Sequence, residues 1–444
     1  MVWGRFLWGI LALGALAGLG FVAYAWEREI APIEPSQLGR FDATQIRQGA
    51  ALAAIGNCGS CHTRPGGATH AGGRALATPF GTIHSTNITP DAETGIGGWS
   101  FEAFARAMRK GVDRAGRHLY PAFPYDHFTL TSEADNRALY AFLMTRAPIN
   151  ATALQNNLPF PLNERLLIAG WKLLYLKQGD FRPDPSKGSA WNRGAYLTEG
   201  LAHCGACHTP RNGMGAEIRG RSLDGGEVEG WVAYAINEES PSPVPWTVDS
   251  LHFYLRNGWH AEHGISRGPM APVTANLGEV SDADVRAIAV YVADRMGARN
   301  PTATQTTPVA DGAQGAGGKP IFDAACASCH DGSRPLPFGG MDLRMSSAVH
   351  APDPTNIVNV ILHGLSPAPG ERSPIMPSYG GVISDAQIVD LLTYMRAAFT
   401  DKPAWSRLAE LVAKQRARGD TLPTYSSDGH LSAPARPNER VTAW

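Results

Sequence analysis

The sequence predicts an all-α protein of three tandem helical domains behind an N-terminal transmembrane helix. Three observations support this prediction. One cysteine motif occurs three times in the 444 residues, a capped helix follows each copy, and a long apolar run lies near the N-terminus. The hydrophobic fraction of 43% is ordinary for a globular protein, and the length suits two to four domains. The net charge of −1, without any long run of like charge, gives no indication of a nucleic-acid partner.

All six cysteines belong to the motif C-x-x-C-H. Two thiols three positions apart on a helical turn can form thioethers with the two vinyl groups of one haem, and the following His then ligates the iron. The motif therefore predicts three covalently bound haem c groups. The cysteines are Cys58, Cys61, Cys204, Cys207, Cys326 and Cys329. The histidines expected on the iron are His62, His208 and His330.

Other uses of this motif fit less well. A disulfide framework would not place a His after each cysteine pair. Zinc needs four ligands, and two thiolates with an adjacent His leave each site short. A thioredoxin-like redox motif requires a βαβ context, which the sequence does not indicate, and it would not occur three times.

A capped helix follows each copy of the motif after a long loop. Each helix begins with a Ser N-cap and has an acid or amide three residues on, which is a capping box or a near relative. The cap residues are Ser132, Ser281 and Ser384. An aromatic residue stands ten positions after each cap (142 − 132, 291 − 281, 394 − 384) and is expected to pack across the helix that carries the cysteines: Phe142, Tyr291 and Tyr394.

Each repeat thus contains a helix that ends at the haem motif, a loop over the haem and a closing helix, which resembles the small helical cytochrome c fold. A domain of ~100 residues has little core of its own, so the haem supplies much of what is packed. The predicted division is a membrane anchor or signal segment (1–28), three cytochrome c domains (40–148, 188–297 and 317–400), a connecting segment (149–187), a flexible Pro/Gly-rich linker (298–316) and a C-terminal tail (401–444).

The N-terminal run from Phe6 to Trp26 has no charged residue. As a helix it would be about 31 Å long at ~1.5 Å per residue, which is enough to cross a bilayer. Arg5 precedes the run, which predicts the N-terminus inside and the rest of the chain outside, at the periplasmic side of a bacterial inner membrane. Ala23-Tyr24-Ala25 offers a cleavage pattern, so a removed signal peptide is the alternative to an anchor.

Two further segments have helical character. Leu158 to Leu176 is strongly apolar and is expected to pack between haem domains, with contact to the membrane or to a partner as the alternative. In the tail, one face of a predicted helix carries Trp405, Leu408, Leu411 and Val412, and a polar extension follows. By default such a tail is loosely ordered.

The sixth iron ligand is expected from a methionine in the loop ahead of each closing helix, because a Met thioether is common in electron-transfer haems and raises the potential. The second domain offers Met270, and the third offers Met376. Neighbouring prolines stiffen both loops. Methionines that follow soon after a haem motif are less suitable: Met214, Met341 and Met345.

The first domain departs from this pattern. From His208 to Met270 the separation is 62 residues (270 − 208), and 61 residues after His62 stands Phe123 (123 − 62). A phenyl ring cannot ligate iron, so the first haem is either five-coordinate or bound by another side chain. His127 is the nearest candidate. The remaining ones are His118, Met108 and Met144.

Several stretches give the chain a family resemblance: Asn87 to Ser100, Gly116 to Tyr125 and Gly264 to Val273, together with the three motifs. They resemble the tri-haem cytochrome c subunits of bacterial membrane-bound dehydrogenases that act on alcohols, gluconate, fructose or aldehydes. In the alcohol and sugar branches a Met typically stands at the position of Phe123. The Phe form looks more like subunits paired with molybdopterin enzymes that oxidise aldehydes or N-heterocycles.

The resemblance implies an electron-transfer subunit without catalytic residues of its own. Its partner would be a catalytic dehydrogenase subunit holding molybdopterin, a quinone cofactor or flavin, with a small iron–sulfur subunit as a further possible member. Its acceptor would be ubiquinone or a terminal oxidase. Two alternatives stay open: a haem enzyme or gas-binding protein with an open first haem, and a cytochrome module of a terminal oxidase.

Overall fold

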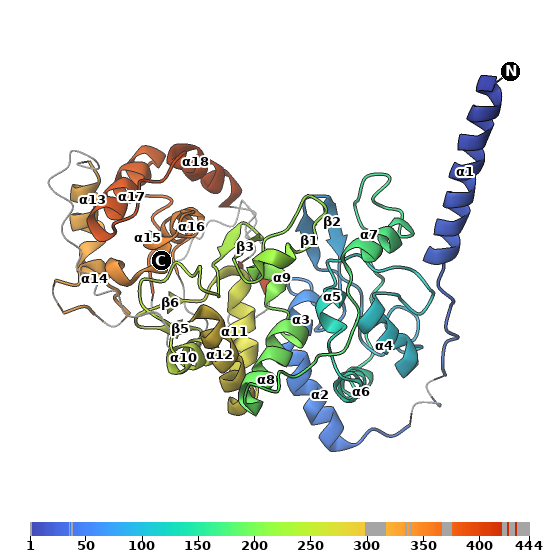
Figure 1. Ribbon diagram of the computed structural model, residues 1–444. Helices are drawn as coiled ribbons and strands as arrows, with labels where there is room; N and C mark the ends of the chain where they lie inside the picture. Colours follow the sequence, from blue (N-terminus) through green and yellow to red (C-terminus); the bar gives the residue numbers. More distant parts are fainter. Residues whose placement is uncertain are drawn as a thin grey trace. The chain divides into compact units, whose positions relative to one another are not determined.

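The computed structural model describes residues 2–34, 36, 39–297, 317–333, 335–337, 339–365, 375–419, 424–425 and 431–432. The predicted linker 298–316 lies outside these residues. The described chain is mostly helical and folds into two compact units (Figure 1). One lies within Met1–Ala53, Cys61–Arg64 and Ala68–Arg182, and the other within Ala54–Ser60, Pro65–Gly67 and Pro183–Trp444. Two of the predicted domains therefore fall within one unit.

The elements up to residue 182 begin with the long apolar helix. Their bounds are α1 (Val2–Ala25), α2 (Ala43–Ile55), α3 (Cys58–Cys61), β1 (Ala75–Thr78), β2 (Gly81–His84), α4 (Phe101–Lys110), α5 (Tyr125–Phe128), α6 (Glu133–Met144) and α7 (Leu167–Tyr175).

The elements that follow form two further groups, each with a first helix, a haem motif, a middle helix and a closing helix. The first of these groups is α8 (Ser189–Tyr196), η2 (Leu197–Leu201), α9 (Gly205–His208), η3 (Arg219–Arg221), β3 (Gly226–Val228), β4 (Trp231–Ala233), α10 (Val248–Asn257), β5 (Trp259–His260), β6 (Gly264–Ile265), η4 (Gly268–Met270), α11 (Ala271–Gly278) and α12 (Asp282–Met296). The last group is α13 (Gly318–Ala325), α14 (Ala327–His330), η5 (Leu343–Met345), α15 (Ser347–His350), α16 (Thr355–His363), α17 (Asp385–Phe399), α18 (Leu408–Arg418), β7 (Thr424–Tyr425) and β8 (Leu431–Ser432).

The strands are a small departure from the all-α expectation. Each described strand pairs with its neighbour in a two-stranded antiparallel hairpin. In β1–β2, for example, Ala75 faces His84 and Thr78 faces Gly81. A hairpin of this kind is marginal by itself, so the helices form the core.

One helix crossing is repeated three times. In each repeat a glycine of the first helix meets a carbonyl of the closing helix, at a distance that leaves no room for a Cβ atom. A Cβ on Gly49 would lie 1.9 Å from the Ala138 oxygen, one on Gly194 1.9 Å from the Ala287 oxygen, and one on Gly318 2.1 Å from the Asp390 oxygen. Apart from the carbonyl group itself, the atom closest to each such Cβ is the Cβ of an aromatic residue: Phe142, Tyr291 or Tyr394. The predicted packing of these aromatics against the first helix agrees with this crossing.

The closing helices begin where the sequence indicates. Ser132 and Ser281 accept hydrogen bonds from the backbone N–H groups of Asp135 and Asp284. Ser384 forms a complete capping box with Gln387, since each side chain accepts from the other's backbone N–H.

The loop between motif and closing helix contains a helix that was not expected. It is α4 in the first repeat, α10 in the second and α16 in the third. Ser100 caps α4, and the buried side chains of Phe104, Ala107 and Met108 fall on one face of it. This periodicity is present in the sequence, but it lies within the segment that was expected to form a loop.

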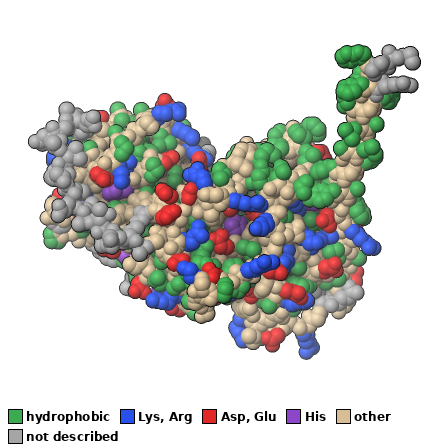
Figure 2. All heavy atoms as spheres, viewed as in Figure 1, with side chains coloured by type: hydrophobic (Ala, Val, Ile, Leu, Met, Phe, Trp, Pro, Cys, Tyr) green, Lys and Arg blue, Asp and Glu red, His purple; other side chains and the backbone are tan. Residues whose placement is uncertain are grey.

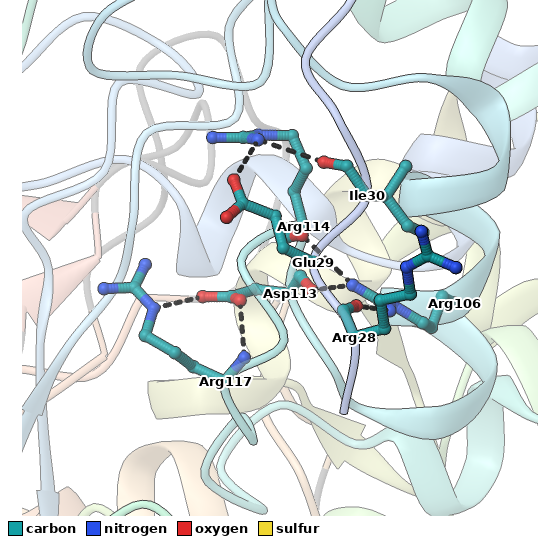
Figure 3. Close-up of polar contacts among 7 residues, drawn as sticks. All are labelled: Arg28, Glu29, Ile30, Arg106, Asp113, Arg114 and Arg117. Carbon is teal, nitrogen blue, oxygen red and sulfur yellow. Dashed lines mark hydrogen bonds and ion pairs between the residues drawn. The ribbon is translucent and has the colours of Figure 1, made fainter. Parts of the chain in front are cut away.

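The chain that follows α1 is fastened to the first unit by arginines (Figure 3). The guanidinium of Arg106 donates to the carbonyls of Arg28 (2.5 Å) and Asp113 (2.5 Å). Arg114 donates to Glu29 Oε1 at 3.0 Å and to the Ile30 carbonyl at 3.1 Å. These bonds join the segment after α1 to α4 and to the loop that follows α4, so the end of α1 has a defined place on this unit.

The connecting segment is helical over only part of the stretch Leu158 to Leu176. Only Leu167–Tyr175 forms a helix, α7, and its buried side chains pack within the first unit. Trp171 contacts Tyr125 with ring centroids 6.1 Å apart. Lys172 donates to the carbonyls of Lys110 (2.7 Å) and Gly111 (2.5 Å) at the end of α4.

The second and third repeats are joined within their unit. The Asn356 side chain on α16 pairs with both backbone groups of Val232 on β4, at 2.9 and 2.8 Å. The buried Asn359 donates to the Gly230 carbonyl at 3.0 Å. Because α16 belongs to one repeat and β4 to the other, this contact explains why the two form one compact unit.

The start of the tail is better ordered than expected. The predicted helix is α18, and both Leu408 and Val412 are buried in the core of the third repeat together with Ile388, while the partly buried Trp405 packs against this core. The Trp405 indole donates to the Ala351 carbonyl at 2.9 Å. A hydrophobic face thus holds this helix against α16 and α17.

Candidate haem-binding sites

The three motif histidines make the same hydrogen bond. Nδ1 lies 2.6 Å from the Thr86 carbonyl in His62, 2.6 Å from the Tyr234 carbonyl in His208 and 2.9 Å from the Met341 carbonyl in His330. A carbonyl can only accept, so Nδ1 must carry the proton. This fixes the tautomer and leaves Nε2 with a lone pair for a metal, as is usual for metal-ligating histidines.

Burial keeps these imidazoles neutral. It lowers the pKa of His62, His208 and His330, and the bond to the carbonyl opposes the shift only in part. A neutral imidazole is the form that binds iron.

The surroundings of two motif cysteines are unlike those of redox-active thiols. No disulfide joins any of the six, all of which lie in the described chain. Burial raises the pKa of Cys204 to about 12 and that of Cys326 to about 11. Redox-active C-x-x-C pairs need a lowered thiol pKa, so the shift argues against that interpretation.

The loops that follow the middle helices have a shared length. In each repeat the middle helix ends at a glycine with positive φ: 60° at Gly111, 73° at Gly258 and 71° at Gly364. Twelve residues later stands the predicted ligand position (123 − 111, 270 − 258, 376 − 364). Counted from these helix ends, Phe123 occupies the place of Met270 and Met376, as the sequence register predicts.

Met270 ends the short 3-10 helix η4 and leads directly into α11. Gly268 has φ 59°, and a Cβ there would lie 2.8 Å from Trp231, so the indole packs directly against this turn. Met376 is half-buried and pairs with Leu365 through two backbone hydrogen bonds of 2.8 and 2.9 Å. Both methionines therefore sit on restrained backbone.

Phe123 belongs to an aromatic cluster. Its ring centroid lies 5.2 Å from that of Phe128 and 6.4 Å from that of Tyr125. Tyr125 is fully buried and also contacts Trp171. The first loop is thus held by ring packing at the position where the other loops present sulfur.

The alternative ligands of the first site have different surroundings. His127 lies in the one-turn helix α5, four residues after Phe123, and its side chain is buried. His118 uses both ring nitrogens: Nε2 lies 2.8 Å from the Ala25 carbonyl and Nδ1 3.0 Å from the Lys172 ammonium. These partners make His118 a structural residue. Met108 on α4 and Met144 on α6 are buried.

The second site also contains a buried polar group that a haem could satisfy. The indole N–H of Trp231 is buried beside the Met270 turn and has no hydrogen-bond acceptor within the described chain. A buried donor of this kind requires a partner, and a haem propionate is an acceptor of the right chemistry.

The carbonyls that hold the histidines could not be found from sequence. They follow their histidines by 24, 26 and 11 residues, and any residue type supplies a carbonyl. The glycine that precedes each ligand position by twelve residues is visible in the sequence. Its role as a helix end can be predicted only if the middle helices are predicted first.

Comparisons with known proteins agree with this geometry. A family described as "Cytochrome C oxidase, cbb3-type, subunit III" matches residues 313–395. The chain is 34% identical over 411 residues to the gluconate 2-dehydrogenase cytochrome c subunit of Pantoea cypripedii, covering 87% of this chain and 92% of that one. It is 32% identical over 428 residues to the alcohol dehydrogenase (quinone) cytochrome c subunit of Gluconobacter oxydans, with 89% and 88% covered.

A further relative is considerably longer than this chain. The chain is 47% identical over 410 residues to one of the subunits of the nicotinate dehydrogenase of Pseudomonas putida, and the match covers 91% of this chain but 34% of that protein. The chain therefore spans about a third of the length of that relative.

Proposed function

Because the chain belongs to the family of cytochrome c subunits of membrane-bound dehydrogenases, we propose that it binds three covalent haem c groups and carries electrons from its partner to ubiquinone or the respiratory chain. The chain is an electron-transfer subunit of a dehydrogenase complex, and the substrate is oxidised by a catalytic partner subunit. The proposed haem domains are residues 40–148, 188–297 and 317–400.

The observation that supports this proposal best is the threefold hydrogen bond of the motif histidines. Each imidazole donates from Nδ1 to a backbone carbonyl, and desolvation lowers its pKa. The haem iron, when bound, supplies one-electron redox chemistry. In each domain the motif histidine would bind the iron through Nε2, and the two motif thiols would attach the haem covalently.

For the sixth ligands we assign Met270 and Met376 on their restrained loops, and His127 for the first haem. Sulfur ligation raises a haem potential, whereas a second histidine lowers it relative to sulfur. The first haem would then have the lowest potential of the three.

The second and third sites are linked through Met341. Its carbonyl holds His330, and its sulfur would lie 3.8 Å from a Cβ placed on Gly264 of β6, in the second repeat. Gly264 precedes Met270 by six residues (270 − 264). This contact brings the residue that holds His330 next to the segment that leads to Met270, and we propose that the second and third haems exchange electrons directly.

The partner is proposed to be a molybdopterin dehydrogenase for an aldehyde or N-heterocycle, with an iron–sulfur subunit. Its support is the 47% identity to the relative from nicotinate dehydrogenase and the Phe at position 123. The helix α1 supplies the proposed anchor in the inner membrane, since Phe6–Ala25 is long and apolar enough to span a bilayer. The haem domains would lie on the periplasmic side.

The mass of the intact purified chain tests the haem count. We expect the polypeptide plus three haem masses, and the same mass less one haem for the double variant Cys204→Ser, Cys207→Ser. A wild-type chain with fewer than three covalent haems contradicts the proposal. The same spectrum shows whether residues 1–25 are retained.

A second candidate function rests on Phe123. If no side chain replaces the missing sulfur, the first haem is open and the protein is a haem enzyme or gas-binding protein. Titration of the reduced protein with carbon monoxide separates the two. We expect no binding for the electron-transfer protein with His127 as ligand, and binding at one haem in three for the alternative.

A further inference from the structure

The outer face of α7 consists of leucines. With 3.6 residues per turn, Leu166, Leu167, Leu173 and Leu174 fall on one side of the helix, with Gly170 between them. Leu173 is 66% exposed and Leu174 65%. In the turn before the helix, Phe160 is 80% exposed. Figure 2 shows hydrophobic side chains gathered in this region beside α1.

The charged residue of α7, Lys172, lies on the inner face of the helix. Lys172 points into the first unit, where its ammonium donates to the carbonyls of Lys110 and Gly111 and contacts His118. Cations are favourable at the C-terminal end of a helix, and these carbonyls end α4. The arrangement is the reverse of a helix at a water-facing surface, where leucines point inward and charges outward.

The apolar face is continuous with the candidate membrane span. A Cβ on Gly170 would lie 3.6 Å from the ring of Phe21 in α1. Phe21 stands four residues before Ala25, the last residue of the apolar run Phe6–Ala25. At ~1.5 Å per residue, the contact lies about 6 Å inside the end of that run.

The end of α1 is also fixed on the unit. Ala25 is 1% exposed, and its carbonyl accepts from His118 at 2.8 Å. Gly116 approaches so closely that a Cβ there would lie 2.2 Å from the Glu27 oxygen. The arginine bonds of Figure 3 hold the next residues. Several contacts therefore fix the position of α7 along the axis of α1.

We propose that α7 and the turn at Phe160 lie in the interfacial layer of the lipid bilayer beside α1. A helix with an apolar face at a depth of about 5–10 Å is the arrangement of interfacial helices. The first unit thus rests on the membrane through a second element, which stops it from swinging about a single helix. This inference rests on the part of the proposed function that places α1 in the membrane.

Spin labels on the full-length haem-loaded chain in phosphatidylethanolamine/phosphatidylglycerol nanodiscs test the proposal. A nitroxide on Leu174→Cys is compared with one on Val382→Cys, an apolar residue that is 76% exposed in the third repeat. We expect the ratio of oxygen accessibility to nickel-complex accessibility to be several-fold higher at position 174, because oxygen concentrates in lipid and the nickel complex stays in water.

Equal ratios at the two positions would place α7 in water and overturn the proposal. A label at position 174 that neither reagent reaches would show a protein partner on this face and would also overturn it. If the intact mass shows that residues 1–25 are absent, the anchor of the proposed function fails. The same label, measured with vesicles of the same lipids, then still decides whether α7 contacts a bilayer. Intact mass with three haems confirms that each labelled chain is folded.

Discussion

In the first repeat α4 ends at Gly111 and the chain reaches Phe123 twelve residues later, and in the second α10 ends at Gly258 and reaches Met270 after the same interval. The motif histidine of each repeat is held in the same way, by a backbone carbonyl at Nδ1. The residue at the end of the interval differs: in the first repeat it is part of a cluster of aromatic rings, and in the second it is a methionine on a short 3-10 helix. The shared helix end and loop length thus allow the residue at the ligand position to change from Met to Phe while the domain keeps its fold.

The scaffold itself should be the most sensitive part. Gly49→Ala and Gly194→Ala each place a methyl group 1.9 Å from a backbone oxygen of the closing helix. Because backbone cannot move aside as a side chain can, we expect each to lower the free energy of unfolding by about 3 kcal/mol or more, with loss of bound haem. Thermal unfolding followed by circular dichroism measures the effect.

Gly213→Ala is the matched control, since no described atom lies within 4 Å of a Cβ at that position. A near-normal melting temperature for Gly49→Ala or Gly194→Ala would show that the repeated crossing is looser than described.

Conversion of the second site into a copy of the first is the next largest change. Met270→Phe removes the proposed sulfur ligand, so the second haem should bind carbon monoxide when reduced and its potential should fall. Difference spectra and a redox titration measure both effects. Met214→Phe, at a position that is 54% exposed, should change neither. Unchanged spectra in Met270→Phe would exclude Met270 as the ligand.

The opposite change tests the first site. His127→Ala should open the first haem to carbon monoxide, and addition of Phe123→Met should close it again by supplying sulfur at the position twelve residues after Gly111. The experiment compares carbon monoxide bound per chain in wild type, single and double variants. If wild type already binds one equivalent and His127→Ala adds none, the ligand assignment of His127 is wrong.

The smallest expected effect concerns how the end of each middle helix is held. Lys172 donates to the Gly111 carbonyl at the end of α4 in the first repeat, whereas near Gly258 in the second the hydroxyls of Ser266 and Thr274 pair at 2.7 Å. Burial lowers the pKa of Lys172 from 10.5 to about 7. Between these values the unfolded chain binds more protons than the folded one, so stability rises with pH, by at most about 1.4 kcal/mol per pH unit.

Hydrogen exchange of the last turn of α4 measures this effect after correction for the intrinsic exchange rate. Protection should increase from pH 7 to pH 10 in the wild type. Lys172→Met should abolish the increase, while the last turn of α10 should show no such dependence in either protein. The same pH dependence in Lys172→Met would assign it to another group.

Several parts of this molecule follow from local sequence. The serine caps at residues 132, 281 and 384 depend on a side chain and a backbone three residues away, and they stand where the sequence indicates. The helix α18 follows from its apolar periodicity. The middle helices α4, α10 and α16 were not predicted, because the long segment between motif and closing helix was expected to form one loop.

Other features could not be predicted from sequence. The bond between His118 and the Ala25 carbonyl spans 93 residues, and that between Lys172 and Gly111 spans 61. Nothing local marks His118 as structural and not as an iron ligand, because its role depends on which nitrogens meet partners after folding.

The sequence by itself determined the chemistry of this protein: three C-x-x-C-H motifs, and a phenyl ring where two methionines set the pattern. These are properties of residue type and spacing, which survive in any fold. Only the tertiary structure decided which carbonyls hold the histidines, and that α7 turns its leucines outward and its lysine inward. The physical reason is that both depend on contacts between segments far apart in the chain. These contacts form only when the chain packs, and no local sequence pattern predicts them.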